Sequence, residues 1–372
     1  MDRPVLIVMS FFLVAAGLDY IFGSPLKLGN KFEEGFKAMG TLALGIIGIY
    51  SISPFLLAIL GPGVQALSSF LHIDPSILPA CIFPVDMGGY TISMSLAQSA
   101  LIGRFSGIII ASTLGATISF SIPVACRFIS KTDNEFFAKG VVIGIISIVP
   151  GCFLAGLFSG IAFFPLLWNM MPLFVIVLLL SIGLIRLPGM TLKGFIVFGK
   201  ILSALGVLGI LFQGLDVILG IKIIPNLVPF TDTVYLVGKI TLILAGAYPM
   251  MEVLNRLLKR SFEKTGRVLG VNAHSVSAII GNLASNLLVF GDLQNMDKKG
   301  KVLCISLAVT TAFVLGGQFA YVATVEPVMV GPFFLSKFIS GILCILIILY
   351  LPVRKRKSGN ALPHKTQNTN TI

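Results

Sequence analysis

Apolar runs of about 18 residues or more recur along almost the whole chain. Each is long enough to cross a hydrocarbon layer about 30 Å thick as a helix, because an α-helix rises about 1.5 Å per residue. Charged residues make up 11% of the sequence, whereas roughly 25% is usual for a soluble domain. No soluble domain fits between the runs. The sequence therefore predicts an all-α polytopic integral membrane protein.

Nine of the runs have the length and composition of full crossings: 4–22, 38–60, 105–129, 139–163, 165–185, 194–220, 234–257, 302–324 and 331–352. Two further segments, 73–103 and 268–296, are apolar but interrupted by Pro, Gly, Asn and Asp. Each of these two is either a full span or a re-entrant hairpin, since broken backbone is tolerated within a membrane where protein or water surrounds it.

The distribution of Lys and Arg separates these options, because cytoplasmic loops carry an excess of both. With two re-entrant hairpins and a cytoplasmic C-terminus, 21 of the 24 Lys and Arg in loops and tail fall inside. If both segments cross fully, the division is 13 to 11, and if only 73–103 crosses it is 19 to 5. We therefore expect about nine transmembrane helices plus two re-entrant hairpins, with 73–103 the less certain of the two hairpins.

The interrupted segments sit in matching surroundings, which predicts an internal repeat with units 38–129 and 234–324. An apolar span ends near a proline in each unit, at Pro54 and Pro249, and a Gly/Ala/Ser/Thr-rich span closes it. Five crossings separate the starts of the two units, and an odd number inverts the second relative to the first. Inverted repeats with discontinuous helices are a recurring plan of secondary transporters.

The membrane domain is expected to cover 1–353, and the basic tail 354–372 has too few apolar residues to fold. Most Lys and Arg lie in short connections, so the net charge of +12 reports topology and not a nucleic-acid partner. Membrane lipid is an expected partner, and a homo-oligomer is compatible with the sequence.

Asp86 is the strongest candidate for chemistry within the membrane. An ionisable group there costs about 2.5–3.5 kcal/mol on insertion scales and needs a reason. Pro84 removes a backbone donor, and Gly88 and Gly89 let the chain break. A carboxylate at this break would pair with a small cation, and Tyr90 or Phe83 would offer it an aromatic face. The alternative is a capping Asp at the tip of the hairpin.

Asn282, Ser285 and Asn286 lie at i, i+3 and i+4 in the second interrupted segment, on one side of a helix. Their neutral polar groups suit hydrogen bonds to a hydroxyl or an ammonium group. Hydrogen bonding between helices within the bilayer is the competing role.

Other charged residues have local interpretations. We expect an i,i+4 ion pair between Glu252 and Arg256, an interfacial anchor at Asp19, and a local hydrogen-bonding role for His274. Asp292 and Glu326 are each either interfacial or pore-lining.

Enzymatic and cofactor-dependent classes find no support. The chain has no GxxxxGK[ST] loop, no HExxH and no cluster of His and Cys, so no cofactor and no metal site is expected. The five cysteines lie within apolar runs and form no CxxC pair, which favours buried structural thiols.

Several short motifs, in order along the chain, resemble the ethanolamine utilisation transporter family of the EutH type. They are Phe32-Glu33-Glu34-Gly35-Phe36, Ala38-Met39-Gly40, Asp86-Met87-Gly88-Gly89, Phe120-Ser121-Ile122-Pro123-Val124-Ala125, Gly246-Ala247-Tyr248-Pro249-Met250, and Met296-Asp297 with Gly300-Lys301-Val302. The resemblance runs from the first span to the last.

This resemblance implies uptake of ethanolamine through the inner membrane of a bacterium. Protonated ethanolamine is a small cation with one hydroxyl, and a permease would matter most at acidic pH, where little neutral amine is present. Members of the family often carry Asp-His where this chain has Gly317-Gln318. The alternatives are a transporter of another small solute, a nucleoside or amino alcohol, and a membrane sensor or assembly protein without flux.

Overall fold

The computed structural model describes residues 3–350, and the basic tail expected at 354–372 lies outside the described residues. Within 3–350 the chain forms helices and connections, with no β-strand. Six of the described helices are long and apolar enough to cross a membrane, and α9 with α10, bent by 42°, is a seventh candidate. The expectation of an all-α polytopic membrane protein is therefore confirmed.

In chain order the α-helices are α1 (Arg3–Ile21), α2 (Gly29–Ser51), α3 (Ser53–Leu71), α4 (Ile77–Ala80), α5 (Tyr90–Leu96), α6 (Ala100–Arg104), α7 (Ile122–Phe128), α8 (Asn134–Phe158), α9 (Phe163–Asn169), α10 (Met171–Arg186), α11 (Pro188–Leu219), α12 (Phe230–Leu269), α13 (Ala273–Asn282), α14 (Leu287–Asp292), α15 (Lys298–Thr310), α16 (Gly317–Val325) and α17 (Val330–Tyr350). Wider π-helical turns form η1 (Val85–Gly89), η2 (Phe105–Gly115) and η3 (Thr117–Ser121), and 3-10 turns form η4 (Lys131–Asp133), η5 (Leu293–Asn295) and η6 (Pro327–Met329).

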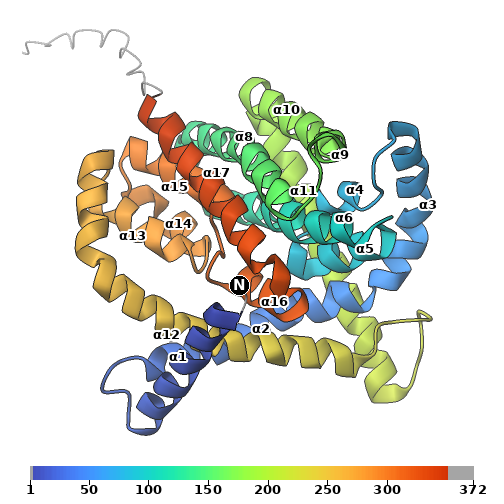
Figure 1. Cartoon of the computed structure of the whole chain (residues 1–372), viewed down its shortest axis with the longest axis horizontal. Helices are drawn as coiled ribbons and strands as arrows, with labels where there is room; N and C mark the ends of the chain where they lie inside the picture. Colours follow the sequence, from blue (N-terminus) through green and yellow to red (C-terminus); the bar gives the residue numbers. More distant parts are fainter. Residues whose placement is uncertain (1–2, 351–372) are drawn as a thin grey trace, which may run out of the picture.

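The centre of the molecule is the helical stretch Ala100–Phe128, of which 78% is buried in its most apolar window. Helix α8 packs against α15 and α17, and the long curved α12 runs along one side against α1 and α2 (Figure 1). Helix α3 lies at the periphery, with only 17% buried. The core is thus built around a span from the first proposed unit.

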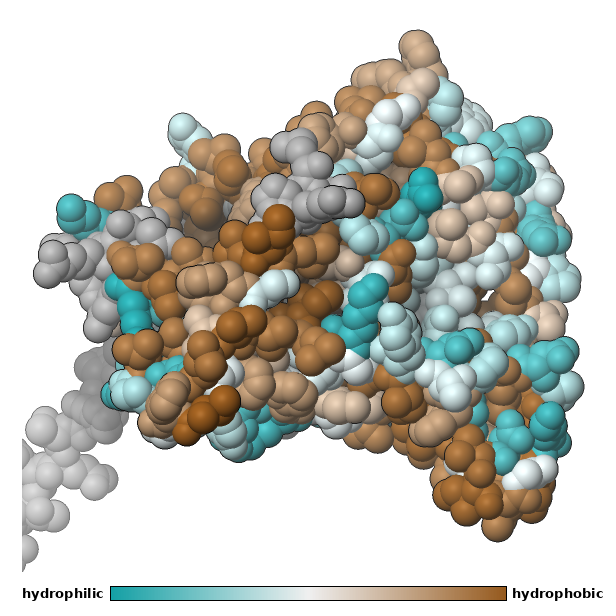
Figure 2. Space-filling view, turned by 60° about the horizontal axis from the view of Figure 1, so that its bottom comes forward, coloured by the Kyte–Doolittle hydropathy of each residue, from teal (hydrophilic) through white to brown (hydrophobic). Residues whose placement is uncertain are grey.

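Large apolar side chains cover much of the outer surface, as Figure 2 shows for one face. Leu178 and Leu179 of α10 are 60% and 62% exposed, and Ile218 of α11 is 80% exposed. Water would not stabilise so broad an apolar surface, whereas lipid chains cover it without loss of hydrogen bonds.

Small residues allow close helix contacts inside this shell. A Cβ at Gly48 of α2 would collide with the backbone of Gly206 in α11, and one at Gly209 would collide with the backbone of Gly48. Since apolar burial gives little driving force in lipid, such close backbone packing contributes much of the helix association.

The first interrupted segment leaves and returns at the same place. The Asp74 carboxylate accepts hydrogen bonds from the backbone of Ser76 (2.9 Å) and of Gln98 (3.0 Å), so the two ends of the segment meet. The Ser93 hydroxyl also donates to the carbonyl of Ser76 at 3.1 Å. We name the segment 73–98 the first hairpin.

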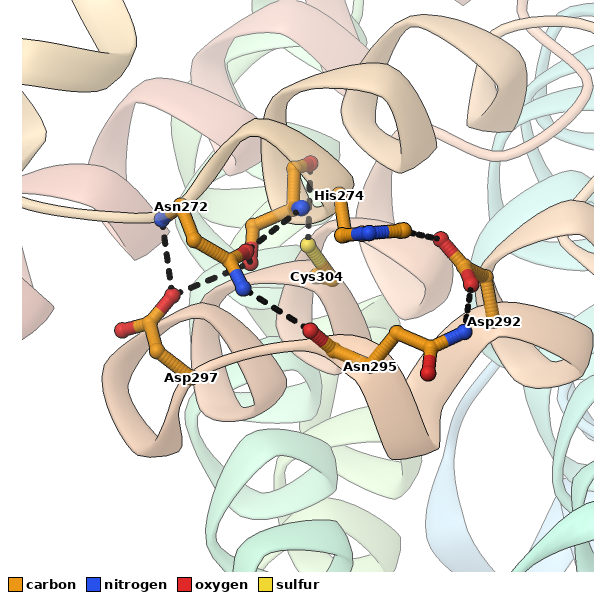
Figure 3. A network of polar contacts seen from close by, with 7 residues as sticks. Asn272, His274, Asp292, Asn295, Asp297 and Cys304 are labelled. Atoms are coloured by element: carbon orange, nitrogen blue, oxygen red, sulfur yellow. Dashed lines mark hydrogen bonds and ion pairs between the residues drawn. The ribbon is translucent and has the colours of Figure 1, made fainter.

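The second interrupted segment closes in the same manner (Figure 3). The Asp297 carboxylate accepts from the backbone N–H of Asn272 at 2.9 Å, and the Asn272 side chain donates to the carbonyl of Asn295 at 2.8 Å. His274 lies 2.9 Å from Asp292, which confirms its expected local role. We name the segment 272–297 the second hairpin.

Four of the nine expected spans differ from the six span-length helices of the described residues. The run 4–22 forms an apolar helix below span length, 165–185 is bent between α9 and α10, and 38–60 and 302–324 are divided, whereas α3, which has span length, lies mostly outside the nine runs. The run 38–60 is divided between α2 and α3, because the chain turns at Ile52 before Pro54. The run 302–324 is divided between α15 and α16, with non-helical backbone at 311–316. The second break faces the second hairpin, because its backbone N–H groups at Phe313 and Leu315 donate to carbonyls of that hairpin.

Candidate functional site

The backbone break in the first hairpin positions Asp86. Pro84 is extended at ψ 152°. Gly88 has φ +87°, a left-handed backbone conformation that residues other than glycine rarely adopt. A Cβ at Gly89 would lie 2.5 Å from the carbonyl oxygens of both Phe83 and Pro84. Gly88 therefore allows the backbone conformation of the turn, and Gly89 leaves room for the neighbouring carbonyl groups. Together they turn the chain at Asp86.

A cavity of about 260 Å³ lies where the turns of the two hairpins meet. Asp86, Pro84 and Met87 line it from the first hairpin, and Ala284, Ser285 and Leu287 line it from the second. Helices α2, α12 and α16, the stretch around Ala116 and Phe120, and Phe313 complete the wall. We name it the Asp86 cavity.

Asp86 is the only charged residue among the described residues that line this cavity. No Lys, Arg or His of the described part of the chain forms an ion pair with it. A carboxylate in a largely apolar space with no cation in direct contact favours the entry of a cation.

Three wall residues fall outside the candidate set derived from sequence. Gln318 is 4% exposed, and its amide oxygen has no hydrogen-bond partner in the described structure. Phe120 and Phe313 meet edge to face, with ring centroids 5.8 Å apart. The sequence signal for Gln318 was its polar side chain in an apolar run, which stood out only as a departure from a family pattern.

Asn282 and Asn286 are fully buried beside the cavity and are absent from its lining. The Asn282 side chain donates to the carbonyl of Leu307 (2.9 Å) and the hydroxyl of Thr311 (3.0 Å). The Asn286 side chain donates to the hydroxyl of Ser121 at 2.8 Å. Both amides tie the second hairpin to neighbouring spans, as expected for hydrogen bonding between helices.

Phe83 and Tyr90 also point elsewhere. Phe83 is 6% exposed and packs in an apolar cluster with Ile49 and Ile92. The Tyr90 hydroxyl donates to Glu326 at 2.9 Å, and Glu326 forms an ion pair with Arg104 at 2.9 Å. Of the eight candidates, the structure thus brings Asp86 and Ser285 together in one cavity, with the glycines behind them.

The remaining charged candidates have local partners. Glu252 pairs with Arg256 at 2.8 Å, as predicted. The Asp19 carboxylate is buried and accepts from the backbone of Leu26, Leu28 and Gly29 at 2.8–2.9 Å. It therefore fixes the connection into α2, a role that the interpretation as an interfacial anchor missed.

Lys337 of α17 is a buried basic residue within an apolar span. It is 1% exposed, and its ammonium group donates to the carbonyls of Ser112 (3.0 Å) and Ala312 (2.8 Å). The same group lies 5.3 Å from the centre of the Phe333 ring. Lys337 thus joins the stretch η2 to the break after α15.

Between residues 3 and 350, no three His, Cys, Asp or Glu side chains gather in a way that would hold a metal ion.

Comparisons with known proteins agree along the whole chain. The family described as "Ethanolamine utilisation protein, EutH" matches residues 1–351. The probable ethanolamine permease EutH of Listeria monocytogenes is 33% identical over 97% of this chain and 96% of its own. The probable ethanolamine permease EutH of Escherichia coli is 32% identical over 94% and 95%, and the uncharacterized protein YxeR of Bacillus subtilis is 32% identical over 92% and 92%. No solved structure matches.

Proposed function

Since this chain belongs to the EutH family of ethanolamine utilisation proteins, we propose that it is a permease that carries protonated ethanolamine across a bacterial cell membrane. Relatives in Listeria and Escherichia carry the name of probable ethanolamine permease. The observation that supports the same function in this chain is the lone carboxylate in the Asp86 cavity.

Asp86 is the partner of the ammonium group in this proposal. The neutral polar groups of Gln318 and Ser285 are available to the hydroxyl of the substrate, and Phe120, Phe313 and Tyr248 supply apolar and aromatic wall. Gly88 and Gly89 shape the turn, and Asn282 and Asn286 hold the opposite turn. Phe83 packs in an apolar cluster, and Tyr90 bonds to Glu326 outside the cavity.

The protonated form suits this cavity better than the neutral amine. The neutral amine crosses lipid unaided. The cation does not, because it would have to lose its hydration in the hydrocarbon layer, so it needs a permease. A membrane potential negative inside favours entry of a monovalent cation by about 2.3 kcal/mol per 100 mV. The permease therefore contributes most at acidic pH, where the cation predominates.

The topology in this proposal has nine crossings, two re-entrant hairpins and inverted units at 38–129 and 234–324. Contacts between loops support it. On the predicted inner side, Arg256 donates to the carbonyl of Leu26 (2.9 Å) and Lys301 pairs with Asp133 (2.6 Å). On the predicted outer side, Asn169 accepts from the backbone of Asp74 (2.7 Å).

Cysteine labelling tests the hairpins. His72 and Gln98 stand at the two ends of the first hairpin, and a re-entrant path puts both on the outer side. A membrane-impermeant thiol reagent added outside is expected to label His72→Cys and Gln98→Cys equally. Four of the five native thiols are buried and Cys126 is half-buried, so the background is expected to be low. Labelling of one variant from outside and the other only from inside would show that 73–98 crosses the membrane.

Uptake of labelled ethanolamine tests the function. Cells that lack their own permease and express the wild-type chain are expected to accumulate the label at pH 5. With Asp86→Asn the uptake rate is expected to fall at least tenfold. Asp292→Asn is the matched control, because Asp292 lies at the far end of the second hairpin, paired with His274.

Membrane abundance of each variant must be matched before uptake rates are compared. Equal uptake by Asp86→Asn and wild type would leave the permease standing and exclude Asp86 as the site of the ammonium group. Absence of uptake by the wild-type chain, in cells and in proteoliposomes, would refute ethanolamine as the substrate.

A further inference from the structure

A second cavity, of about 330 Å³, lies beside the Asp86 cavity and is lined by four tyrosines. They are Tyr50 of α2, Tyr90 of α5, Tyr235 of α12 and Tyr321 of α16. Over half of the seven tyrosines of the chain gather in this one place. We name it the tyrosine cavity.

The two cavities follow one another along the same elements. On α2 the lining passes from Ile46 to Tyr50, and on α16 it passes from Gln318 to Tyr321. Between η1 and α5 it passes from Asp86 to Tyr90. Steps of three to four residues along a helix place these lining residues about 5–6 Å apart along its axis, so the two cavities are neighbours.

Helix α12 gives the same order in the reverse direction. Its residues Asp232 to Lys239 line the tyrosine cavity, and Leu244 and Tyr248 line the Asp86 cavity. In the proposed topology α12 runs inward while the lining stretches of α2, α5 and α16 run outward. All four elements therefore place the tyrosine cavity on the outer side.

Packed side chains separate the two spaces. The rings of Tyr90 and Tyr321 meet edge to face with centroids 6.3 Å apart, and Tyr321 is 1% exposed. The hydrogen bond from Tyr90 to Glu326 and the ion pair of Glu326 with Arg104 hold one side of this partition.

We propose that the tyrosine cavity is an outer binding site for small organic ammonium ions, occupied before the ion passes to the Asp86 cavity. This inference rests on the proposed function, since it assigns a second site to the same substrate class. Tyrosine rings attract ammonium groups through their electron-rich faces, and several rings around one space form a cage for such a group.

The described residues that line the tyrosine cavity include one acidic and one basic side chain, whose charges largely cancel. Its preference for a cationic ligand therefore depends on the tyrosine rings. Asp232 is available to a cation, whereas the ammonium group of Lys239 opposes one. Lys239 is exposed, and its bond to the carbonyl of Thr324 is long, at 3.4 Å. Lys239 therefore limits the affinity of the site.

Direct binding to the purified full-length chain tests the proposal, with labelled ethanolamine at acidic pH as the probe. The wild-type chain is expected to bind two molecules, one in each cavity. Tyr235→Leu is expected to weaken one of the two sites about threefold, and Tyr50→Leu with Tyr235→Leu about tenfold, given the usual strength of cation–π contacts. Asp86→Asn is expected to remove the other site.

Matched variants separate the ring from other effects. Tyr235→Phe keeps the ring and is expected to retain both sites. Tyr350→Leu alters an 83% exposed tyrosine outside the cavity and is expected to change nothing. Lys239→Gln removes the opposing charge and is expected to strengthen the outer site about threefold.

Three results would overturn the inference. Binding of a single molecule that Asp86→Asn abolishes and the tyrosine variants leave unchanged would remove the outer site and leave the permease intact. Weaker binding of ethanolamine to Lys239→Gln would show that Lys239 supports the site and does not oppose the bound group, which contradicts an ammonium site limited by this lysine. Absence of any binding to the wild-type chain would refute the proposed function together with this inference.

Discussion

The two hairpins meet at one cavity but break the helical path in different places. In the first, the break lies within the hairpin, at Pro84 to Gly88, and the following stretch from Ala100 to Phe128 is uninterrupted apart from its wide turns. In the second, the hairpin turns at 283–286, and the following span is itself interrupted at 311–316.

The second break is bonded to its own hairpin. The backbone N–H groups of Phe313 and Leu315 donate to the carbonyls of Asn282 (3.2 Å) and Leu283 (2.8 Å). Phe313 adopts φ +60°, an unfavourable conformation for a residue with a side chain. Hairpin and span thus satisfy each other's free backbone groups, which unwound backbone within a membrane requires.

The comparison teaches that a similar layout can serve two tasks. The first hairpin packs tightly, and it brings the carboxylate of Asp86. The second exposes Leu287 and Leu288 by 42% and 56% and brings neutral polar groups. We therefore expect the first hairpin to tolerate little change in shape and the second to tolerate more.

Adding one methyl group to each hairpin is expected to give the largest difference in stability between the two. Gly89→Ala is expected to lower stability by about 3 kcal/mol, the upper end for overpacking, because the three nearest atoms in its way all belong to the backbone. Gly291→Ala in α14 meets nothing within 4 Å and is expected to be neutral or stabilising by up to about 1 kcal/mol. Thermal unfolding in detergent, followed by size-exclusion chromatography, measures both. Equal losses would contradict the contrast in packing.

Removing the carboxylate that closes each hairpin would sharpen the comparison. Asp74 is 6% exposed and holds two backbone donors, so Asp74→Ala is expected to cost about 2 kcal/mol. Asp297 is more exposed and also caps α15, so Asp297→Ala is expected to cost about 1 kcal/mol. The same unfolding assay decides the order, and a larger loss for Asp297→Ala would reverse our ranking of the two hairpins.

The smallest effect is expected at the rim of the second hairpin. His274 is 56% exposed, and its contact with Asp292 lies near solvent, so His274→Gln is expected to change stability by less than about 0.5 kcal/mol. Uptake should also keep its dependence on pH in this variant. A marked shift in the pH profile of uptake would give His274 a role that its local contact does not suggest.

Sequence alone predicted the class of the fold. It also predicted that Asp86 lies at a backbone break, because Pro84, Gly88 and Gly89 indicate a break within an apolar run. It also predicted the pair of Glu252 and Arg256 from their spacing. The break at 311–316 could not be predicted, since it depends on hydrogen bonds to a hairpin some 30 residues away. The position of the tyrosine cavity next to the Asp86 cavity could not be predicted either, because it depends on how four separate elements align.

Lys337 has a consequence for the electrical work of transport. When Lys337 is in its ammonium form and Asp86 is a carboxylate, their opposite charges offset each other without an ion pair between them, so the unoccupied centre carries no net charge. Binding of an ammonium substrate then makes the centre positive. Under the proposed function, the membrane voltage would act on the loaded protein and leave the return of the empty protein nearly unaffected.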